Sequence, residues 1–403
     1  MKKIVSLLMV AVMLLSCAAL VACGGTETAE ETATEAKAVK VGFIFLHDEN
    51  STYDKNFMDA ATAATEALGL TADQVMIKTN IPESNECYEA AADLVDAGCN
   101  VIFADSFGHE DFIIQAAKEF PDVVFSHATG TKAHTENLPN FYNAFASIYE
   151  GRFLVGAAAG MKLNEMIEAG EITADQAKMG YVGAYPYAEV KSGYTSFFLG
   201  ARSICPSVTM DVKFTNSWFD IAAEKETANA LIADGCVLIS QHADSEGAPK
   251  ACEEAGVPNV AYNLDTREWG PNTALISSKI NWQPYFEHLI TSVRDGKEIT
   301  QDFCGGLKEN VVQTLGLNEA VAAEGTKAKL DELAEKLIAG EIKVFDTATF
   351  TVGGAPLTEY MADVDSDEAF TPDTQVVSDG YFHESEMRSA PYFDIDIDGI
   401  TIK

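Results

Sequence analysis

Side chains that could bind a small planar molecule follow short apolar runs in two parts of the chain. The first group comprises His47, Tyr53, Asn56, Asp105, Ser106 and Phe107, and the second comprises Tyr185, Tyr187, Trp218, Gln241, His242, Asp244, Asn263 and Asp265. Aromatic rings beside amide and carboxylate groups suit an uncharged polar ring, such as a nucleobase or a sugar. Each residue alone has a structural explanation, either core packing for a ring or helix capping for Asp105 and Asp265. Their grouping predicts a binding site.

Two of the preceding runs belong to a repeated pattern. The stretches GCNVIFADSF at 98–107 and GCVLISQHAD at 235–244 share Gly, Cys and Ile at an offset of 137 residues. Each block predicts a helix that ends at a glycine, a buried strand, and polar residues where the strand stops. Ligands bind beyond the carboxyl ends of strands in open parallel sheets. Two such edges therefore predict two lobes that face one cleft.

Apolar runs of strand length alternate with amphipathic helical stretches from residue 39 to residue 262. This alternation predicts an α/β fold in which two doubly wound parallel-sheet lobes are joined by a hinge. We place lobe 1 at 39–146 and lobe 2 at 147–272, with the first crossing near 143–150. Residues 273–340 are expected to return to lobe 1 and the hinge region, and residues 341–403 to form a C-terminal extension that packs on the lobes.

The N-terminus predicts a lipoprotein signal peptide at 1–23. Lys2 and Lys3 precede an apolar run that is too short and wrongly flanked to span a membrane. The sequence LVAC at 20–23 resembles the bacterial lipobox, in which the cysteine, here Cys23, becomes acylated; an ordinary signal peptide is the alternative. Residues 24–38 lack large apolar side chains and are expected to form a flexible tether. We therefore expect a lipid-anchored protein on the extracytoplasmic face of the cell membrane, in a periplasm or at the cell surface.

The chain is strongly acidic, with 62 Asp and Glu against 27 Lys and Arg in 403 residues and a formal charge of −35. This charge repels nucleic acid and anionic lipid, so neither is expected as a partner. The net negative charge also disfavours a phosphorylated ligand, unless a local basic pocket offsets that charge. Six cysteines follow Cys23 without any CxxC motif, and we expect buried thiols, although Cys236 and Cys252 could pair.

No motif of a common catalytic or metal site is present: GxSxG, the Walker loop, GxGxxG and HExxH are all absent. The run DIDIDG at 394–399 begins like a calcium loop, but the glutamate that such a loop requires would fall beyond Lys403. An alternating edge strand is expected there instead. Although a catalytic triad is defined by geometry rather than spacing, no catalytic residue, cofactor or metal is expected.

Five stretches resemble the basic membrane protein family of substrate-binding lipoproteins, whose members include purine nucleoside receptors of ABC importers. They are IFADSFGHEDFIIQAAKEFPDVVFSHATG at 102–130, GYVGAYPYAEVKSGYTSFFLGARS at 180–203, TNSWFD at 215–220, QHADS at 241–245 and YNLD at 262–265. The resemblance spans residues 40–300 and implies a type I periplasmic binding protein. Such a protein delivers a small molecule to ABC permease and ATPase subunits, and we expect it to be a monomer.

The resemblance also assigns roles to residues. It implies ring-stacking by Tyr53 or Phe107 and by Trp218, and it places a conserved lysine at Lys279. Groups that hold ribose or base edges would be Asp105, Asp244, Asn263 and Asp265. The complete predicted ligand set is His47, Tyr53, Asn56, Asp105, Ser106, Phe107, Tyr187, Trp218, Gln241, Asp244, Asn263, Asp265 and Lys279.

The chain departs from the receptor branch at two places. The usual Gly-Phe-Asn of the first loop is replaced by Thr52-Tyr53-Asp54 or by Asn56-Phe57, and Asn263 stands where many members have Asp. The predicted ligand is therefore a purine nucleoside or a free purine base. The alternatives are a sugar or another small metabolite, a chemosensory receptor of the same fold, and a nucleoside hydrolase.

Overall fold

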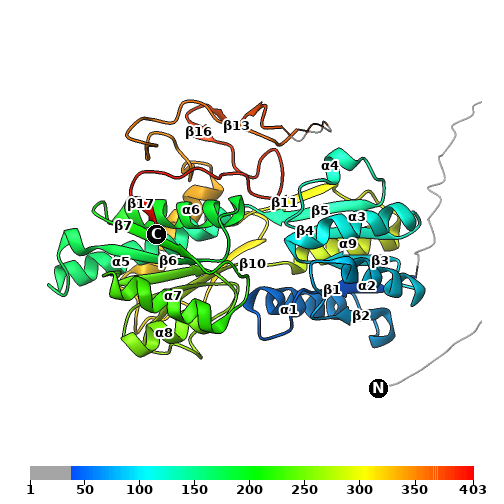
Figure 1. Ribbon diagram of the computed structural model, residues 1–403, viewed down its shortest axis with the longest axis horizontal. Coiled ribbons are helices and arrows are strands. Elements are labelled where there is room, and N and C mark those ends of the chain that lie inside the picture. Colours follow the sequence, from blue (N-terminus) through cyan, green and yellow to red (C-terminus); the bar gives the residue numbers. More distant parts are fainter. Residues whose placement is uncertain (1–37, 366, 368, 370) are drawn as a thin grey trace, which may run out of the picture. The chain divides into compact units, whose positions relative to one another are not determined.

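The computed structural model describes residues 38–365, 367, 369 and 371–403. The predicted signal peptide with its lipobox lies outside the described residues, as does the tether except for Ala38. Contacts group the described residues into a single unit that contains two large sheets, shown in Figure 1. None of its helices is long and apolar enough to cross a membrane.

The sheet of the first lobe has six parallel strands in the order β11-β5-β4-β3-β1-β2. Their bounds are β1 Val41–Ile44, β2 Val75–Lys78, β3 Val101–Ala104, β4 Val124–Ala128, β5 Phe141–Ala146 and β11 Asp302–Gly305. Both β1 and β3 are buried along their whole length, because helices cover the two faces of the sheet. Helices α1 (Thr52–Ala67) and α9 (Gln283–Asp295) pack together on one face, and α2 (Asn85–Asp96) and α3 (Glu110–Glu119) pack together on the other.

The sheet of the second lobe has seven strands in the order β12-β10-β9-β8-β6-β7-β17, parallel except for the pair β12–β10. The strands are β6 Lys178–Gly183, β7 Thr209–Phe214, β8 Leu238–His242, β9 Asn259–Tyr262, β10 Ala274–Ile280, β12 Val312–Leu315 and β17 Ile400–Ile402. Its helices are α5 Ile148–Glu168, α6 Ala188–Ile204, α7 Ile221–Ala233, α8 Gly247–Ala255 and α10 Thr326–Ile338. The α/β fold with doubly wound parallel sheets is thus confirmed.

The repeated Gly-Cys blocks occupy equivalent places in the two lobes. Gly98 ends the turn after α2 and Gly235 ends the turn after α7, with φ angles of 90° and 88°. A left-handed residue at this position lets a helix stop and the chain reverse into β3 or β8, and glycine adopts it without steric strain. The repeat therefore builds the frame of both lobes.

The chain passes between the sheets at three places: from β5 to α5 at Ser147, from β10 to α9, and from β11 to β12. Residues 273–340 are therefore divided between the two sheets instead of returning as a block to lobe 1. Strand β10 stays in the second sheet because it pairs with β9 and β12, whereas α9 and β11 pack with the first lobe. The sequence pattern did not show this, because the pattern that predicts a strand does not indicate which sheet the strand joins.

The C-terminal extension packs mainly on the second lobe. Buried residues Phe345, Phe393, Ile395 and Ile397 belong to the same hydrophobic cluster as α5 and α6, and β17 adds a strand beside β7. The described residues of this region include four two-residue strands: β13 Met361–Ala362, β14 Thr374–Gln375, β15 Val377–Ser378 and β16 Tyr381–Phe382. The prediction of an edge strand at 394–399 is wrong. Buried and exposed side chains alternate along this segment, which packs against the lobe, but it forms no strand.

Among the described residues, all six cysteines after Cys23 are free thiols, so Cys236 and Cys252 do not pair. Five are buried, as expected, but Cys304 on β11 is exposed. β11 forms the outer edge of its sheet, because it pairs only with β5 there.

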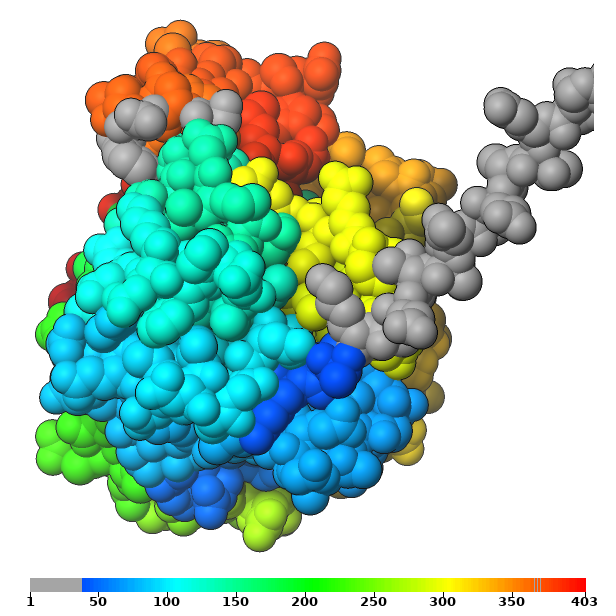
Figure 2. Space-filling view, turned by 90° about the vertical axis from the view of Figure 1, so that its right-hand side faces the viewer, coloured from blue at the N-terminus to red at the C-terminus, as the bar shows by residue number. Residues whose placement is uncertain are grey.

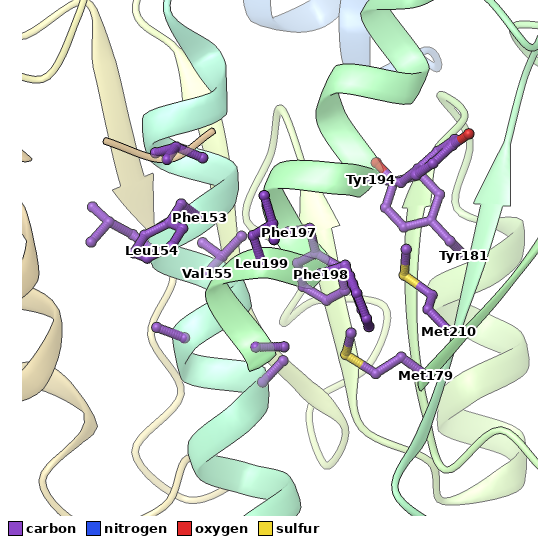
Figure 3. Close-up of a cluster of buried hydrophobic side chains, with 14 of the residues drawn as sticks. Phe153, Leu154, Val155, Met179, Tyr181, Tyr194, Phe197, Phe198, Leu199 and Met210 are labelled. Carbon is purple, nitrogen blue, oxygen red and sulfur yellow. The ribbon is translucent and has the colours of Figure 1, made fainter. Parts of the chain in front are cut away.

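Helices α5 and α6 make the closest helix contact of the second lobe. Figure 3 shows Phe153 to Val155 of α5 beside Phe197 to Leu199 of α6, with Met179 and Met210 of the sheet next to them. A Cβ atom added to Gly156 would lie 2.1 Å from the carbonyl oxygen of Phe197, and one added to Gly200 would lie 2.0 Å from that of Phe153. The two backbones can approach this closely only because both positions are glycine.

We expect Gly156→Ala to force the two helices apart and to lower the free energy of unfolding by about 1–3 kcal/mol. Chemical denaturation of the purified protein measures this change. The matched control is Gly270→Ala, whose added methyl would approach only the Thr273 hydroxyl oxygen, at 2.9 Å, and no backbone atom closer than 3.4 Å. Equal losses in the two variants would contradict the proposed backbone contact.

Candidate ligand-binding cleft

A cavity of about 360 Å³ lies between the two lobes at the carboxyl ends of their strands. Its lining comes from the segments after β1, β3 and β4 in the first lobe and from those after β6, β7 and β8 in the second. The lining residues are Leu46, His47, Tyr53, Asp54, Ser106, Phe107, Thr129, Glu189, Trp218, His242 and Asp244. This is the edge at which parallel sheets bind ligands.

The first-lobe wall is organised by the carboxylate of Asp54 at the start of α1. Ser51 caps the helix by accepting a hydrogen bond from the Asp54 backbone N–H, and its hydroxyl donates to Asp54 Oδ2 over 2.5 Å. Asp54 Oδ1 accepts from the His47 backbone N–H at 2.7 Å, and Oδ2 lies 3.3 Å from His47 Nδ1. Burial opposes ionisation, but the bonds from His47 and Ser51 hold the pKa of Asp54 below its ordinary value.

Behind this wall lies Asp105, the first residue after β3, which is completely buried. Its Oδ1 accepts from the Leu46 backbone N–H at 3.1 Å, and its backbone carbonyl accepts from the Tyr53 hydroxyl at 2.8 Å. Burial, followed by the nearby Asp54 carboxylate, raises the pKa of Asp105 well above its ordinary value. Asp105 therefore fixes the positions of Leu46 and Tyr53. Its raised pKa means that the carboxyl group favours the neutral form.

In the second-lobe wall, His242 at the end of β8 lies 3.3 Å from the Glu189 carboxylate, which belongs to the first turn of α6. Burial lowers the pKa of His242, and the nearby Arg152 guanidinium acts in the same direction. Burial also raises the pKa of Asp244 well above its ordinary value, with further contributions from Glu224, Asp54 and Glu189. The cleft thus presents acidic side chains, whose oxygens accept hydrogen bonds from donor groups of a ligand.

Arg152 of α5 supplies a positive charge beneath this wall. Its side chain is fully buried, its guanidinium lies 3.6 Å from the centroid of the Tyr262 ring, and Nη1 donates to the Gln241 carbonyl at 3.2 Å. The ring of Tyr262 contacts that of His242 edge to face, with 4.9 Å between centroids. A cation that lies over an aromatic face and near Asp244 partly offsets the acidity of the cleft.

The lobes touch across the cleft, so the structure is a closed form. The Thr52 backbone N–H donates to the Asp244 carbonyl at 2.8 Å. The ring of His47 lies 5.4 Å from that of Phe219, and the ring of Phe107 lies 5.4 Å from that of Tyr187. These contacts join the first lobe to the second and must separate when the cleft opens.

A larger outer chamber of about 800 Å³ adjoins the cavity and shares Phe107, Thr129, Glu189 and Trp218 with it. Tyr187 lines only this outer chamber. Although their rings contact each other at a tilt of 31°, Phe107 and Tyr187 both remain 44% exposed. Large aromatic rings that stay exposed at the mouth of a cleft are available to contact a ligand.

The structure brings seven of the thirteen predicted ligand residues to the two chambers: His47, Tyr53, Ser106, Phe107, Trp218 and Asp244 line the inner cavity, and Tyr187 lines the outer chamber. The other six lie elsewhere. Asp105, Asn56 and Gln241 are buried and bonded within the protein: Asn56 Nδ2 donates to the Ile280 carbonyl at 2.8 Å, and Gln241 Oε1 accepts from Asn259 Nδ2 at 2.9 Å. Gln241 does not line the cavity because adjacent residues of a strand face opposite sides of the sheet, and its neighbour His242 faces the cleft.

The remaining three predicted residues lie near the end of the second sheet. Asn263 is buried in a left-handed conformation with φ of 69°. Asp265 is paired with Arg267, whose Nε lies 2.9 Å from Asp265 Oδ2. Lys279 lies on β10, where it pairs in register with Gln313 of β12. None of the three lines either chamber.

The prediction omitted five residues that line the inner cavity: Leu46, Asp54, Thr129, Glu189 and His242. His242 and Asp54 are polar residues that follow predicted strands, but the predicted ligand set does not include them. Thr129 follows β4 with φ of 63°, an unusual conformation for a β-branched residue. Its place after a strand end was the available signal. The sequence held no signal for Glu189, since an acidic residue in the first turn of a helix is also favoured by the helix dipole.

Comparison with known proteins identifies the family. A model of the Bmp family, described as ABC transporter substrate-binding protein PnrA-like, matches residues 41–348. The chain belongs to this family. A purine-binding protein of Brucella abortus is 32% identical over 325 residues, which cover 80% of this chain and 85% of that protein. A putative ABC transporter glucose-binding protein of Haloferax volcanii is 30% identical over 311 residues, 77% of this chain and 72% of that protein.

Solved structures agree on the fold. An ABC transporter solute-binding protein from Conexibacter woesei superposes with a TM-score of 0.62 at 20% identity, covering 76% of this chain and 98% of that one. One from Aeropyrum pernix gives a TM-score of 0.63 at 19% identity, covering 76% of this chain and 93% of that one. The type I periplasmic binding protein fold is thus confirmed. As a Bmp family member, the chain is an extracytoplasmic substrate-binding protein that works with an ABC transporter and is not an enzyme.

The raised pKa of Asp105 makes stability depend on pH. The folded state keeps a proton on Asp105 at pH values where the unfolded chain, with an ordinary pKa near 3.8, has lost it. Its contribution to stability therefore falls as pH rises from that value towards the folded-state pKa. We expect Asp105→Asn, which cannot ionise, to raise the melting temperature by roughly 2–4 °C at pH 7.5 and to give no such gain at pH 4.

Thermal unfolding monitored by circular dichroism at the two pH values measures this difference. The matched control is Asp96→Asn, because Asp96 is exposed and its substitution should change neither melting temperature. A loss of stability in Asp105→Asn that is equal at both pH values would contradict the expected pH dependence.

Proposed function

We propose that the interlobe cleft binds a purine nucleoside or a purine base, and that the protein presents this ligand to an ABC importer as a lipid-anchored receptor. The observation that carries the proposal is that aromatic rings and buried carboxyl groups from both lobes line one cavity. The similarity to a purine-binding protein of Brucella abortus supports the same ligand class.

The cavity lining suits the chemistry of a purine. Phe107 and Trp218 offer ring faces from opposite lobes, and a flat heteroaromatic ring gains stabilisation by stacking on such faces. Asp54, Glu189 and Asp244 offer acceptor oxygens for the N–H groups of a base or the hydroxyls of a ribose. Protonated Asp244 can also donate to a ring nitrogen, because its raised pKa favours the neutral form.

Ligand binding is coupled to lobe closure in this proposal. Walls from both lobes enclose one cavity, so a ligand gains contacts with both only in the closed form, and its binding shifts the hinge equilibrium towards closure. The closed form in turn presents a single joined surface to the permease. The hydrogen bond from Thr52 to the Asp244 carbonyl and the Phe107–Tyr187 contact would form in the same step.

A sugar is the second candidate ligand, and the similarity to a putative glucose-binding protein of Haloferax volcanii favours it. Sugars also stack on aromatic rings, and their hydroxyls donate to carboxylates. The two candidates differ in size and in the number of ring faces that they present, so binding assays separate them directly.

A thermal-shift panel of purine bases, purine nucleosides, glucose and galactose tests the ligand class. We expect stabilisation by at least one purine and none by the sugars. Stabilisation by a sugar without any purine response would reject the proposal and support the second candidate.

The Trp218 ring is expected to contribute by stacking, which is worth about 1–3 kcal/mol for a nucleobase. Trp218→Ala should therefore weaken purine binding about tenfold or more by isothermal titration calorimetry. Trp269→Ala is the matched control, since Trp269 lines neither chamber and its substitution should leave the affinity unchanged. Unchanged binding in Trp218→Ala would place the ring of the ligand elsewhere.

We further propose that a lipid on Cys23 anchors the protein, on the support of the LVAC sequence at 20–23. Cys23→Ser should release the protein from the membrane fraction, and mass spectrometry of the wild-type N-terminus should find an acylated cysteine. Cys205→Ser is the matched control, because Cys205 is a buried thiol within the folded unit. Membrane retention of Cys23→Ser protein from which the apolar leader has been cleaved would contradict a lipid anchor.

A further inference from the structure

A second cavity lies apart from the interlobe cleft, where the C-terminal extension packs beside the start of α5 and the end of α10. Its volume is about 390 Å³, close to the 360 Å³ of the inner cavity of the cleft, and the two cavities share no lining residue. We call it the hinge cavity. The residues of its lining that carry the argument are Tyr149, Glu150, Lys343, Phe345, Tyr381 and Glu386.

Two distant parts of the chain build the hinge cavity. Glu150 lies in the first turn of α5, directly after the first crossing between the lobes. The opposite wall is β16 with its neighbours, which lies beyond the family match at 41–348. The Phe382 backbone N–H donates to the Phe345 carbonyl at 3.0 Å, so this wall is bonded to the segment after α10. Figures 1 and 2 show the orange part of the extension on the outside of the folded unit. The cavity therefore depends on the extension.

Four aromatic residues form the apolar part of the lining. The ring of Tyr149 lies 5.4 Å from that of Phe345, and the ring of Phe345 lies 6.2 Å from that of Phe382, both between centroids. The two phenylalanines are almost completely buried, whereas Tyr149 and Tyr381 are partly exposed. The phenylalanines therefore fix the inner wall, and the two tyrosines remain accessible to a small molecule.

Carboxyl groups make the surroundings of the hinge cavity acidic. Glu150 Oε2 accepts a hydrogen bond from the Leu307 backbone N–H at 2.7 Å, and burial raises the pKa of Glu150. Burial, followed by the Glu150 carboxylate, raises the pKa of Tyr149 well above its ordinary value, and Glu384 and Glu386 act in the same direction. Negative groups on several sides attract a cation and repel an anion.

The side chain of Lys343 shows that one ring of this cavity attracts an ammonium group. Its Nζ lies 4.5 Å from the centroid of the Tyr381 ring, which is the geometry of a cation–π contact. Lys343 is exposed, so its side chain can move into solvent. It is the one cationic side chain of the lining, against the carboxylates of Glu150 and Glu386. A ligand with an ammonium group would thus meet rings, two carboxylates and a single competing charge.

We propose that the hinge cavity binds a small organic cation that carries a quaternary or primary ammonium group. Aromatic rings beside carboxylates are the combination that recognises such groups, and the acidic surroundings exclude phosphates and carboxylates. The bond from Leu307 to Glu150 places this site beside the crossing from β11 to β12. The site is separate from the interlobe cleft, so it neither requires nor restricts the ligand proposed there.

Isothermal titration calorimetry with choline, ethanolamine and dimethylbutanol tests the site. Dimethylbutanol is the neutral isostere of choline, with carbon in place of the ammonium nitrogen. We expect choline, ethanolamine or both to bind, and choline to bind at least about tenfold more tightly than the neutral alcohol. A preference for choline would assign the rings the larger part, and a preference for ethanolamine the carboxylates.

Three variants locate the bound cation. Glu150→Gln keeps an acceptor for Leu307 but removes the charge, and Tyr381→Leu removes a ring, so each should weaken binding about tenfold. Lys343→Met removes the competing charge and should strengthen binding several-fold. Lys118→Met is its matched control, because Lys118 is an exposed lysine on α3 of the first lobe, and it should leave the affinity unchanged.

Equal affinity for choline and the neutral alcohol would overturn the proposed site, as would the absence of binding by both ammonium compounds. Unchanged affinity in Glu150→Gln and Tyr381→Leu would place the cation elsewhere and overturn it as well. If Glu150→Gln failed to fold, Tyr381→Leu and Lys343→Met would still decide, because they are expected to change the affinity in opposite directions.

Discussion

The closed cleft depends on the burial of carboxyl groups that are close enough to repel one another. Asp54, Asp105 and Asp244 come from both lobes and are almost completely inaccessible to water. Ionising all three together in this setting would be strongly unfavourable, so hydrogen bonds keep Asp54 charged while burial favours protons on Asp105 and Asp244. Because Asp54 is charged while Asp105 and Asp244 favour their neutral forms, acidic residues can form the walls of a closed cavity. The charged and neutral carboxyl groups together provide acceptors and donors for a polar ligand.

The frame that brings these groups together is held by contacts remote from the cleft. Helices α5 and α6 meet through glycines whose positions admit no side chain, and α5 begins directly after the first crossing between lobes. The buried Arg152 lies on the same helix, one turn after that crossing, and its charge reaches His242 and Asp244. One of the three crossings between the lobes and the charge beneath the second-lobe wall therefore belong to the same helix.

The C-terminal extension gives this cleft a boundary that the two sheets alone would not provide. Its aromatic and aliphatic residues complete the core of the second lobe, and its last strand extends that sheet. Between these anchors, residues 388–394 reach the mouth of the cleft and are tied to β11 of the first lobe. Hydrogen bonds to Asp302 of the first lobe and to Lys191 and Tyr194 of the second join this part of the extension to both lobes.

The sequence alone determined the two-lobed α/β fold, the repeated helix–strand blocks at Gly98 and Gly235, and the strand ends at which the cleft forms. Local patterns suffice for these features, because periodicity and helix-ending glycines act within a few residues. The sequence could not show which side of a strand end faces the cleft. The predicted ligand set contains Gln241, whereas its neighbour His242 lines the cavity. It likewise could not separate Asp105, which supports the wall, from Asp244, which forms it. Nor could it show that β10 joins the second sheet, or that residues 388–394 reach the cleft. Those outcomes depend on pairing and packing between segments far apart in the chain, which only the tertiary structure decides.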